Sequence, residues 1–342
     1  MHREVPLLNR WTGSALFVLR SCFPGSGLLE EARKRNVRSA ASRMQDGASL
    51  EVDRRKDLSE EEFVSRYLNP GIPVVFDGQA LDWPCASKWN LDFLRDRFGE
   101  ETFPVVDSTG LVEEALDRSK GADDARLITR ISAREFVDAI RRGEKPYLRG
   151  CPIMETRPEL LADLDLTWLK RMRRCLFGVS LQTYVGAADR TTPLHCETTA
   201  TFFVLADGRK RWTFFSPASS AIVNPEPEGR GYNFSRANPG APDPERYPGF
   251  AKLTRLTCQM RKGDVLFVPA WMWHEVENLS ESWGVSYRFT HLRGFLRYPA
   301  FAFVRLFLAK PRLLETLYYS FFKGDMGSRE RTLLIPKVSL RD

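Results

Sequence analysis

Between about residue 147 and residue 290, short apolar runs alternate with turn signals, and this pattern constrains the fold more than any other feature of the chain. The run TFFVL at 201–205 is followed by an Asp-Gly pair and then by RWTFFS at 211–216. A third run, VLFVP at 265–269, follows a Gly-Asp pair. Short runs rich in β-branched and aromatic residues, bounded by glycine and aspartate, are typical of strands joined by turns. The pattern therefore predicts a mostly β protein.

Three side chains in these strands have the chemistry of a metal site. His195 and Glu197 stand two residues apart, so in a strand both point to the same face. His274 ends the strand-like region that follows the third apolar run. Two histidines and one carboxylate form the facial triad of non-haem Fe(II) oxygenases, which leaves the opposite coordination positions open. Cys196 would point to the other face and is not counted as a ligand.

Composition restricts the class of protein. Of the 342 residues, 43% are hydrophobic and 28% are charged, which is typical of a globular protein of one elaborated domain or two. The net charge of +7 permits an acidic partner such as nucleic acid, although a basic solvated surface explains it as well. Six cysteines without a CxxC pair predict reduced thiols and an intracellular, cytoplasmic location. We expect no membrane partner, since no apolar run reaches the roughly 18 residues of a span.

Residues 1–45 carry eight Lys or Arg and three acidic residues. Three interpretations remain open: a disordered basic tail, a mitochondrial-type presequence, or a mis-set start with Met44 as the true first residue. The tail and the mis-set start are favoured over targeting. Ordered sequence is expected to begin after residue 45, with helices capped by Ser59 and Ser132.

Two segments outside the strands could carry function. The Pro- and Gly-rich stretch at 216–250 interrupts the strands, and it carries Tyr232, Phe234 and Tyr247 among arginines. Such an insertion is more often a functional loop or lid than part of a core. From residue 295 onward, aromatic residues recur at helical spacing. This stripe either packs against the strands or forms a homodimer interface.

Several segments together resemble the JmjC family of cupin-like oxygenases, in particular its small hydroxylases of the factor-inhibiting-HIF kind. The matching segments are IPVVFDGQALDWPCASKW, KPYLRG, TTPLHCETTATFF, GRKRWTFFSP and KGDVLFVPAWMWHEVEN, in the family's order. The resemblance implies a mostly β fold with flanking helices, a double-stranded β-helix or jelly-roll barrel of the cupin type. It implies an N-terminal α/β extension over 46–140, the barrel over 141–293 and a C-terminal helical segment over 294–342.

The resemblance also implies the cofactors Fe(II) and 2-oxoglutarate, with O2 as cosubstrate. His195, Glu197 and His274 match the family's iron ligands. Glu197 stands where Asp is common among the hydroxylases, and Glu is frequent in other JmjC branches.

Four further residues match the family's cosubstrate pocket. Lys210 matches the lysine that pairs with the distal carboxylate of 2-oxoglutarate, and Thr192 and Tyr147 match hydroxyls that share this carboxylate. Arg288 falls about where an Asn lines the pocket in the family. A carboxylate held inside a barrel needs a buried cation and hydroxyl donors, because its desolvation is otherwise uncompensated.

The function that follows is hydroxylation of a C–H bond in a protein side chain or another substrate, with 2-oxoglutarate converted to succinate and CO2. Three alternatives remain open: an N-methyl-lysine demethylase, a tRNA-base hydroxylase, and a non-catalytic cupin-like binding protein. The expected partner is a protein or peptide, with tRNA as the alternative.

Overall fold

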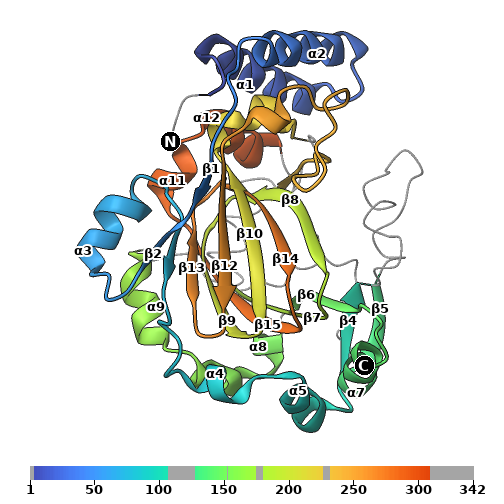
Figure 1. Ribbon diagram of the computed structural model, residues 1–342, viewed down its shortest axis with the longest axis vertical. Coiled ribbons are helices and arrows are strands. Elements are labelled where there is room, and N and C mark those ends of the chain that lie inside the picture. The colour runs from blue at the N-terminus through green and yellow to red at the C-terminus, as the bar shows by residue number, and fades with distance from the viewer. Residues whose placement is uncertain (1–3, 107–127, 152, 175–179, 226–231, 309–342) are drawn as a thin grey trace.

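The structure is a computed structural model, and it describes residues 4–106, 128–151, 153–174, 180–225 and 232–308 (Figure 1). Two β-sheets form its centre, and helices surround them at both ends and along one side. The first sheet has the strand order β1-β12-β10-β14-β8-β11. Its strands are β1 Ser49–Glu51, β8 Thr191–Glu197, β10 Arg209–Phe215, β11 Tyr232–Phe234, β12 Arg255–Arg261 and β14 Trp273–Asn278.

The second sheet has the order β2-β3-β13-β9-β15-β7-β6-β4-β5. Its strands are β2 Asp53–Arg55, β3 Val74–Phe76, β4 Thr102–Val106, β5 Ile128–Ser132, β6 Tyr147–Cys151, β7 Ser180–Gly186, β9 Ala200–Asp207, β13 Val265–Val268 and β15 Ser282–Phe289. Strands β7, β8, β9 and β10 fall alternately in the two sheets, and so do β12, β13, β14 and β15. This alternation is the topology of a double-stranded β-helix, and the predicted fold class is confirmed.

The Asp-Gly turn between β9 and β10 carries the chain from one sheet to the other. Gly208 has φ of +87°, a backbone conformation that side chains with a Cβ rarely adopt. A Cβ built on Gly208 would lie 2.0 Å from the carbonyl oxygen of Glu281, so the turn also requires a residue without a side chain at this position. The sequence signal for a turn was therefore right, and the turn joins two layers of the barrel.

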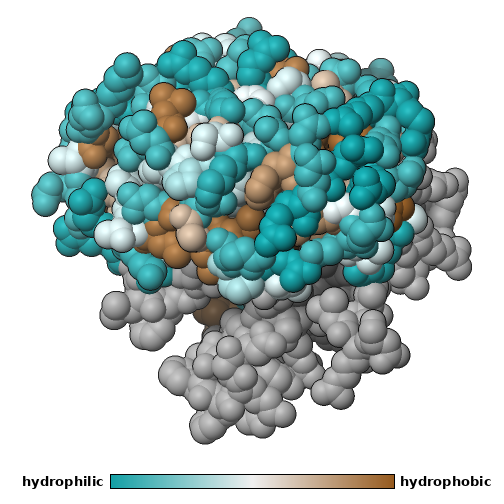
Figure 2. Space-filling model, turned by 90° about the horizontal axis from the view of Figure 1, so that it is seen from below, coloured by the Kyte–Doolittle hydropathy of each residue, from teal (hydrophilic) through white to brown (hydrophobic). Residues whose placement is uncertain are grey.

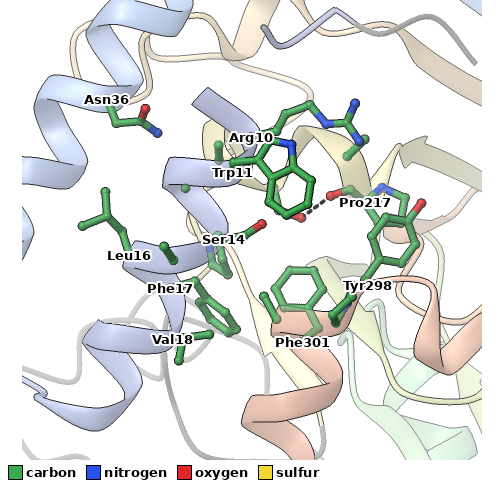
Figure 3. A pocket seen from close by; sticks show the side chains of 18 of the residues that line it. Arg10, Trp11, Ser14, Leu16, Phe17, Val18, Asn36, Pro217, Tyr298 and Phe301 are labelled. Carbon is green, nitrogen blue, oxygen red and sulfur yellow. Dashed lines mark hydrogen bonds between the residues drawn. The ribbon is translucent and has the colours of Figure 1, made fainter. Parts of the chain in front are cut away.

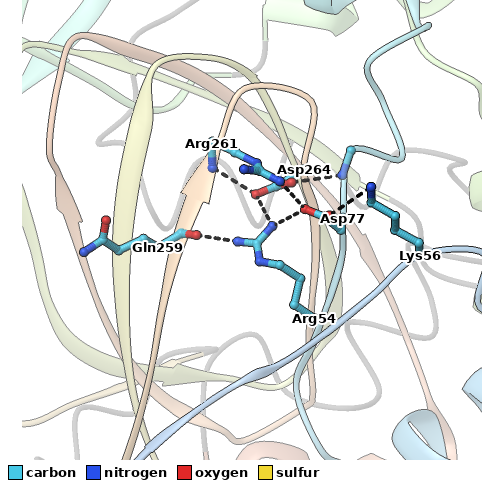
Figure 4. Close-up of polar contacts among 7 residues, drawn as sticks. Arg54, Lys56, Asp77, Gln259, Arg261 and Asp264 are labelled. Atoms are coloured by element: carbon cyan, nitrogen blue, oxygen red, sulfur yellow. Dashed lines mark hydrogen bonds and ion pairs between the residues drawn. The ribbon is translucent and has the colours of Figure 1, made fainter.

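The turn between β12 and β13 is held by charge (Figure 4). The fully buried Asp264 accepts hydrogen bonds from the backbone N–H of Gly78 at 3.0 Å and of Arg261 at 2.9 Å. It also accepts from the guanidinium of Arg54 at 2.9 Å, which pairs with Asp77 at 2.6 Å. A buried carboxylate is tolerated because these donors replace water. The network fixes β2 and the end of β3 against the barrel.

Helices of the N-terminal extension begin at the expected caps. The Ser59 hydroxyl accepts from the N–H of Glu62 at 3.2 Å, and Ser132 accepts from the N–H of Glu135 at 3.1 Å. The helices of this region are α3 Glu60–Phe63, η1 Val64–Leu68, α4 Pro84–Lys88, α5 Leu91–Phe98 and α7 Ala133–Arg141, and three helices between β6 and β7 pack beside them: α8 Ile153–Thr156, η4 Pro158–Asp163 and α9 Leu166–Arg173. An aromatic cluster joins them to the second sheet: Phe63, Phe76, Trp168, Phe202 and Phe267.

The expectation of a disordered tail over residues 1–45 is corrected by two helices, α1 Leu7–Cys22 and α2 Gly27–Ala41. They form a hairpin that lies against the C-terminal helices at one end of the barrel (Figure 1). Phe17, Val37 and Ala40 are buried in a cluster that also holds Trp271 and Phe301. The basic residues between them, of which Lys34, Arg35 and Arg38 are exposed, concealed this apolar spacing in the sequence.

The C-terminal helices α11 Leu292–Leu296, α12 Pro299–Phe303 and η7 Val304–Leu308 pack within the chain. The ring of Phe301 lies 4.9 Å from that of Phe17 and 5.3 Å from that of Trp271, centre to centre. Phe301 of the aromatic stripe therefore packs within the chain, whereas Phe303 and Phe307 are exposed, and the described part of the stripe does not establish a homodimer. The predicted second helix, after Pro311, lies outside the described residues.

The insertion at 216–250 is only partly a loop. It contains η5 Pro217–Ser219, α10 Ser220–Val223 and the edge strand β11, and it is followed by η6 Phe250–Lys252. Tyr247 is buried, so this aromatic side chain of the insertion packs inward and is not presented to a substrate. Strand β11 lies beside β8, with Phe234 opposite His195. The insertion therefore borders the candidate metal site from the sheet edge.

The molecular surface is mixed in character. On the face shown in Figure 2, hydrophilic residues dominate and apolar residues form narrow strips between them. Each helix in the described part of the chain is too short or too polar to cross a bilayer. The cysteines in those residues are free thiols: Cys22, Cys85, Cys151, Cys196 and Cys258.

Candidate metal and cosubstrate site

Two neighbouring strands bring the predicted histidines together. β8 pairs with β14 so that His195 lies directly opposite His274, and their ring centres are 4.2 Å apart. Each histidine is 6% exposed. Strand alternation puts Glu197 on the same face as His195, and a carboxylate oxygen of Glu197 lies 3.8 Å from His195 Nε2. The three residues, which span 79 positions of the sequence, thus meet on one face of the first sheet.

Both imidazoles are oriented by the backbone. His195 Nδ1 lies 2.8 Å from the Pro193 carbonyl oxygen, and His274 Nδ1 lies 2.9 Å from that of Met272. A carbonyl can only accept, so each Nδ1 carries the proton and each Nε2 keeps its lone pair. Burial lowers the pKa of both histidines, so both rings are neutral near pH 7. Neutral imidazoles held in this way are the usual state of a histidine metal ligand.

Glu197 has a cationic partner that the sequence did not predict. The Arg288 guanidinium donates to a Glu197 carboxylate oxygen at 2.6 Å and to the Tyr184 hydroxyl at 2.9 Å. Tyr184 in turn donates to the Gln182 side-chain oxygen at 3.1 Å. As these side chains stand, no group of three or more His, Cys, Asp or Glu in the described ranges is arranged to hold a metal ion.

The donor set nevertheless fits a divalent metal. The two Nε2 atoms are unprotonated, and the carboxylate shares their face of the sheet. Carboxylate ligands of metals are themselves usually hydrogen-bonded to an outer partner, which is the place that Arg288 takes beside Glu197. The single carboxylate with two imidazoles matches non-haem Fe(II) in ligand type.

Lys210 on β10 is fully buried and lies opposite Asn278 on β14. Its ammonium donates to the Asn278 side-chain oxygen, and the ring of Phe203 lies 5.8 Å away. Burial lowers the pKa of Lys210 to about 7. Among the described residues no carboxylate pairs with it. A buried cation whose partners are neutral is a suitable site for an anionic ligand group.

The predicted hydroxyls lie in the same corner of the barrel. Tyr147 Oη and Thr192 Oγ1 are 3.4 Å apart, and both side chains are buried. Burial raises the pKa of Tyr147 to about 12, so the phenol stays protonated and can donate. A Cβ on Gly186 would lie 2.6 Å from the Tyr147 ring and 3.2 Å from the Asn278 amide nitrogen. Gly186 therefore brings Tyr147 next to the partner of Lys210.

Sequence reasoning missed three residues of this site, although signals for them exist. Asn278 stands four residues after His274 in a strand, so alternation places both on one face. Arg149 stands two residues after Tyr147, and its guanidinium lies 5.8 Å from the ring of Phe234. Tyr184 has no such signal, because only the fold brings β7 beside β15.

The fold and the site define a class of protein, and comparison with known sequences agrees. The profile of the cupin-like domain family matches residues 59–293, and the chain belongs to this family. The predicted membership of the cupin-like, JmjC-type group is thereby confirmed.

The sequence identity to the individual relatives is low. The chain is 28% identical over 239 residues to lysine-specific demethylase 8 of Xenopus tropicalis, which covers 67% of this chain and 50% of the relative. It is 26% identical over 249 residues to the protein of the same name from Danio rerio, covering 69% and 58%. It is 28% identical over 249 residues to tRNA wybutosine-synthesizing protein 5 of Mus musculus, covering 69% and 76%. The chain thus spans about half the length of the first two relatives.

Proposed function

We propose that this protein is an Fe(II)- and 2-oxoglutarate-dependent oxygenase that hydroxylates a C–H bond of its substrate. The observation that carries the proposal is the combination of two neutral histidines and Glu197 on one face with the buried Lys210 on the adjacent strand, which has no carboxylate partner among the described residues. A metal site alone would suit many proteins. A metal site with a buried cation beside it suits a cosubstrate that chelates through one end and carries a carboxylate at the other.

In this proposal His195, Glu197 and His274 would hold the iron, and Lys210 with Asn278 would hold the far carboxylate of 2-oxoglutarate. When bound, iron and 2-oxoglutarate supply the chemistry by which one atom of O2 enters succinate, the other enters the substrate C–H bond, and CO2 leaves. The chain's own contribution is binding, orientation and exclusion of water.

Each of these contributions has a structural basis. The backbone carbonyls fix the tautomer of both histidines, and the aromatic rings of Trp212 and Phe214 lie 5.4 Å and 6.2 Å from that of His274. These rings form an apolar wall that keeps water from the metal side. Tyr147 and Thr192 would donate hydroxyl hydrogens to the carboxylate at Lys210. We propose that Arg288 acts through Glu197, as a positioning residue, and does not contact the cosubstrate directly.

The charge around the site bears on the substrate. Arg149 lies over Phe234, whose ring centre is 5.8 Å from that of His195. Within the described residues, the Arg149 guanidinium has no carboxylate partner. Its positive field disfavours a cationic methyl-lysine beside the metal. This favours hydroxylation over N-demethylation, although two of the relatives above are named lysine-specific demethylases.

Two other functions remain as alternatives. A tRNA-base hydroxylase is supported by the basic charge of the chain and by a relative named as a tRNA wybutosine-synthesizing protein. Arg149 beside Phe234 also suits a phosphate next to a stacked base. A non-catalytic cupin-like binding protein would need a site that has lost a ligand, whereas all three ligands and Lys210 are present.

The proposal is tested by succinate formation. Purified protein is incubated with Fe(II), ascorbate and 2-oxoglutarate, alone and with acidic peptides, basic peptides or tRNA. We expect slow succinate release without substrate and faster release with one substrate class. The matched control is His274→Ala. Equal succinate release by both proteins, or none by either under any condition, would remove the enzymatic function and leave a binding protein.

A further inference from the structure

A groove of about 470 Å³ lies between α1 and the segments around α10 and α12, away from the metal site (Figure 3). One wall comes from α1, with Trp11, Ala15 and Phe17, and the other from Tyr298 and Phe301. Its volume falls within the range of roughly 300–1,000 Å³ that small-molecule sites occupy. Trp11 is 70% exposed and lines the groove, so its ring is accessible to a ligand.

The walls of the groove are held by specific contacts. A Cβ on Gly13 would lie 2.6 Å from the Cβ of Ala221, so α1 crosses α10 at van der Waals distance. Asn9 and Asn36 exchange hydrogen bonds that join α1 to α2, at 2.9 Å and 3.0 Å. The groove is therefore built into the packing of the helical hairpin.

The charged residues of the lining are all basic. They are Arg10, Arg20, Arg33 and Arg297, and no acidic residue lines the groove within the described ranges. Arg20 and Arg33 share the carboxylate of Glu30 just outside the lining. Arg297 donates to two backbone carbonyls of the turn before β3. The Arg10 side chain forms no ion pair or hydrogen bond with any described residue, so its charge is available to a ligand.

A hydrogen-bond donor stands beside this charge. Tyr298 points into the groove near Arg10 (Figure 3). Burial raises the pKa of Tyr298, and the nearby Arg297 and Arg10 oppose this shift. The hydroxyl therefore stays protonated at neutral pH. Within the described residues it has no hydrogen-bond partner.

We propose that this groove binds a long-chain carboxylate, taken up as a monomer from solution, with its head on Arg10 and Tyr298 and its chain along Trp11, Phe17 and Phe301. A neutral apolar ligand would leave the Arg10 charge uncompensated. A small polar anion would leave the aromatic wall in water. The concave shape admits a single chain and does not match a flat bilayer. The site is independent of the proposed oxygenase activity.

The test is calorimetric titration of the metal-free protein with dodecanoate below its micelle concentration. We expect saturable binding of one dodecanoate per chain. Arg10→Ala should weaken binding about 10- to 100-fold, the loss that one charge-assisted hydrogen bond corresponds to. Tyr298→Phe should weaken it less, and Ala15→Trp should abolish it by filling the groove. The matched control is Arg38→Ala, which removes an exposed charge of α2 that does not line the groove.

The possible outcomes separate the proposal from its rivals. Retained affinity in Arg38→Ala with loss in Arg10→Ala supports a specific head site. Equal weakening in both variants would mean general attraction to a basic surface and would overturn the proposal. So would equal affinity for dodecanol, absence of saturable binding, or binding only to anionic phospholipid vesicles. Because Arg10 and Tyr298 are only half-buried, Arg10→Ala and Tyr298→Phe are expected to fold and test the site even if Ala15→Trp does not fold.

Discussion

Replacing Lys210 by Met should stabilise the metal-free protein while removing its cosubstrate site. The side chain is fully buried, and burial lowers its pKa from 10.5 to about 7. Between these two values the unfolded chain binds more protons than the folded one, so the stability of the wild type rises with pH in this window. By the linkage relation, burying Lys210 lowers the free energy of unfolding of the wild type by about 4 kcal/mol at pH 7 and by about 2 kcal/mol at pH 9. Above pH 11 it lowers this free energy by almost nothing. Met fills a similar volume without the charge.

The assay is urea unfolding of metal-free wild type and Lys210→Met at pH 7, 8 and 9. We expect the variant to be more stable, with an advantage that shrinks as the pH rises. The matched control is Lys262→Met, because Lys262 is half exposed and pairs with Asp207 at 3.4 Å; it should change stability by less than about 0.5 kcal/mol. A variant that is less stable than the wild type at pH 7, or an advantage that does not depend on pH, would refute the reasoning.

Three further predictions concern the metal side and the barrel. His195→Ala and His274→Ala should each fold but bind less than a tenth of the iron of the wild type, measured as metal per chain after anaerobic reconstitution; full loading of either would contradict the assignment. Arg288→Gln should lower the affinity for Co(II) about 10- to 100-fold, as expected for an outer partner of a ligand; tighter binding would mean that Arg288 competes with the metal for Glu197. Gly208→Ala should destabilise the fold by roughly 1–3 kcal/mol in urea unfolding, because its φ is positive and a Cβ would meet a backbone carbonyl; an unchanged midpoint would show that the turn can relax.

The parts of the site that the sequence predicts are those set by strand alternation. His195 and Glu197 share a face because they are two residues apart in one strand. His274 joins them because β14 pairs with β8 in the register that places His274 opposite His195. The turn before Lys210 is visible in the sequence through Gly208, whereas the cosubstrate role of Lys210 came from the family resemblance. These features depend on local geometry, and local geometry is what a single sequence encodes most directly.

The parts that the sequence does not predict depend on distant contacts. Arg288 reaches Glu197 across 91 positions, and the chain gives no local sign of this pair. The helical hairpin at the N-terminus has apolar residues at helical spacing, but a basic composition concealed them. The Arg288–Glu197 pair and the helical hairpin were missed for the same reason. In both cases a distant part of the chain determines whether a side chain is buried or solvated.

The most direct test of the oxygenase proposal is calorimetric binding of 2-oxoglutarate to the protein with and without Mn(II), a redox-stable substitute for Fe(II). The proposal predicts one 2-oxoglutarate per chain, with high affinity only when the metal is present and with a large loss in Lys210→Met. Succinate, which keeps the distal carboxylate but lacks the chelating 2-oxo acid, should bind weakly whether or not the metal is present. Equal affinity for 2-oxoglutarate with and without metal, or no binding in either condition, would contradict the joint metal and cosubstrate site.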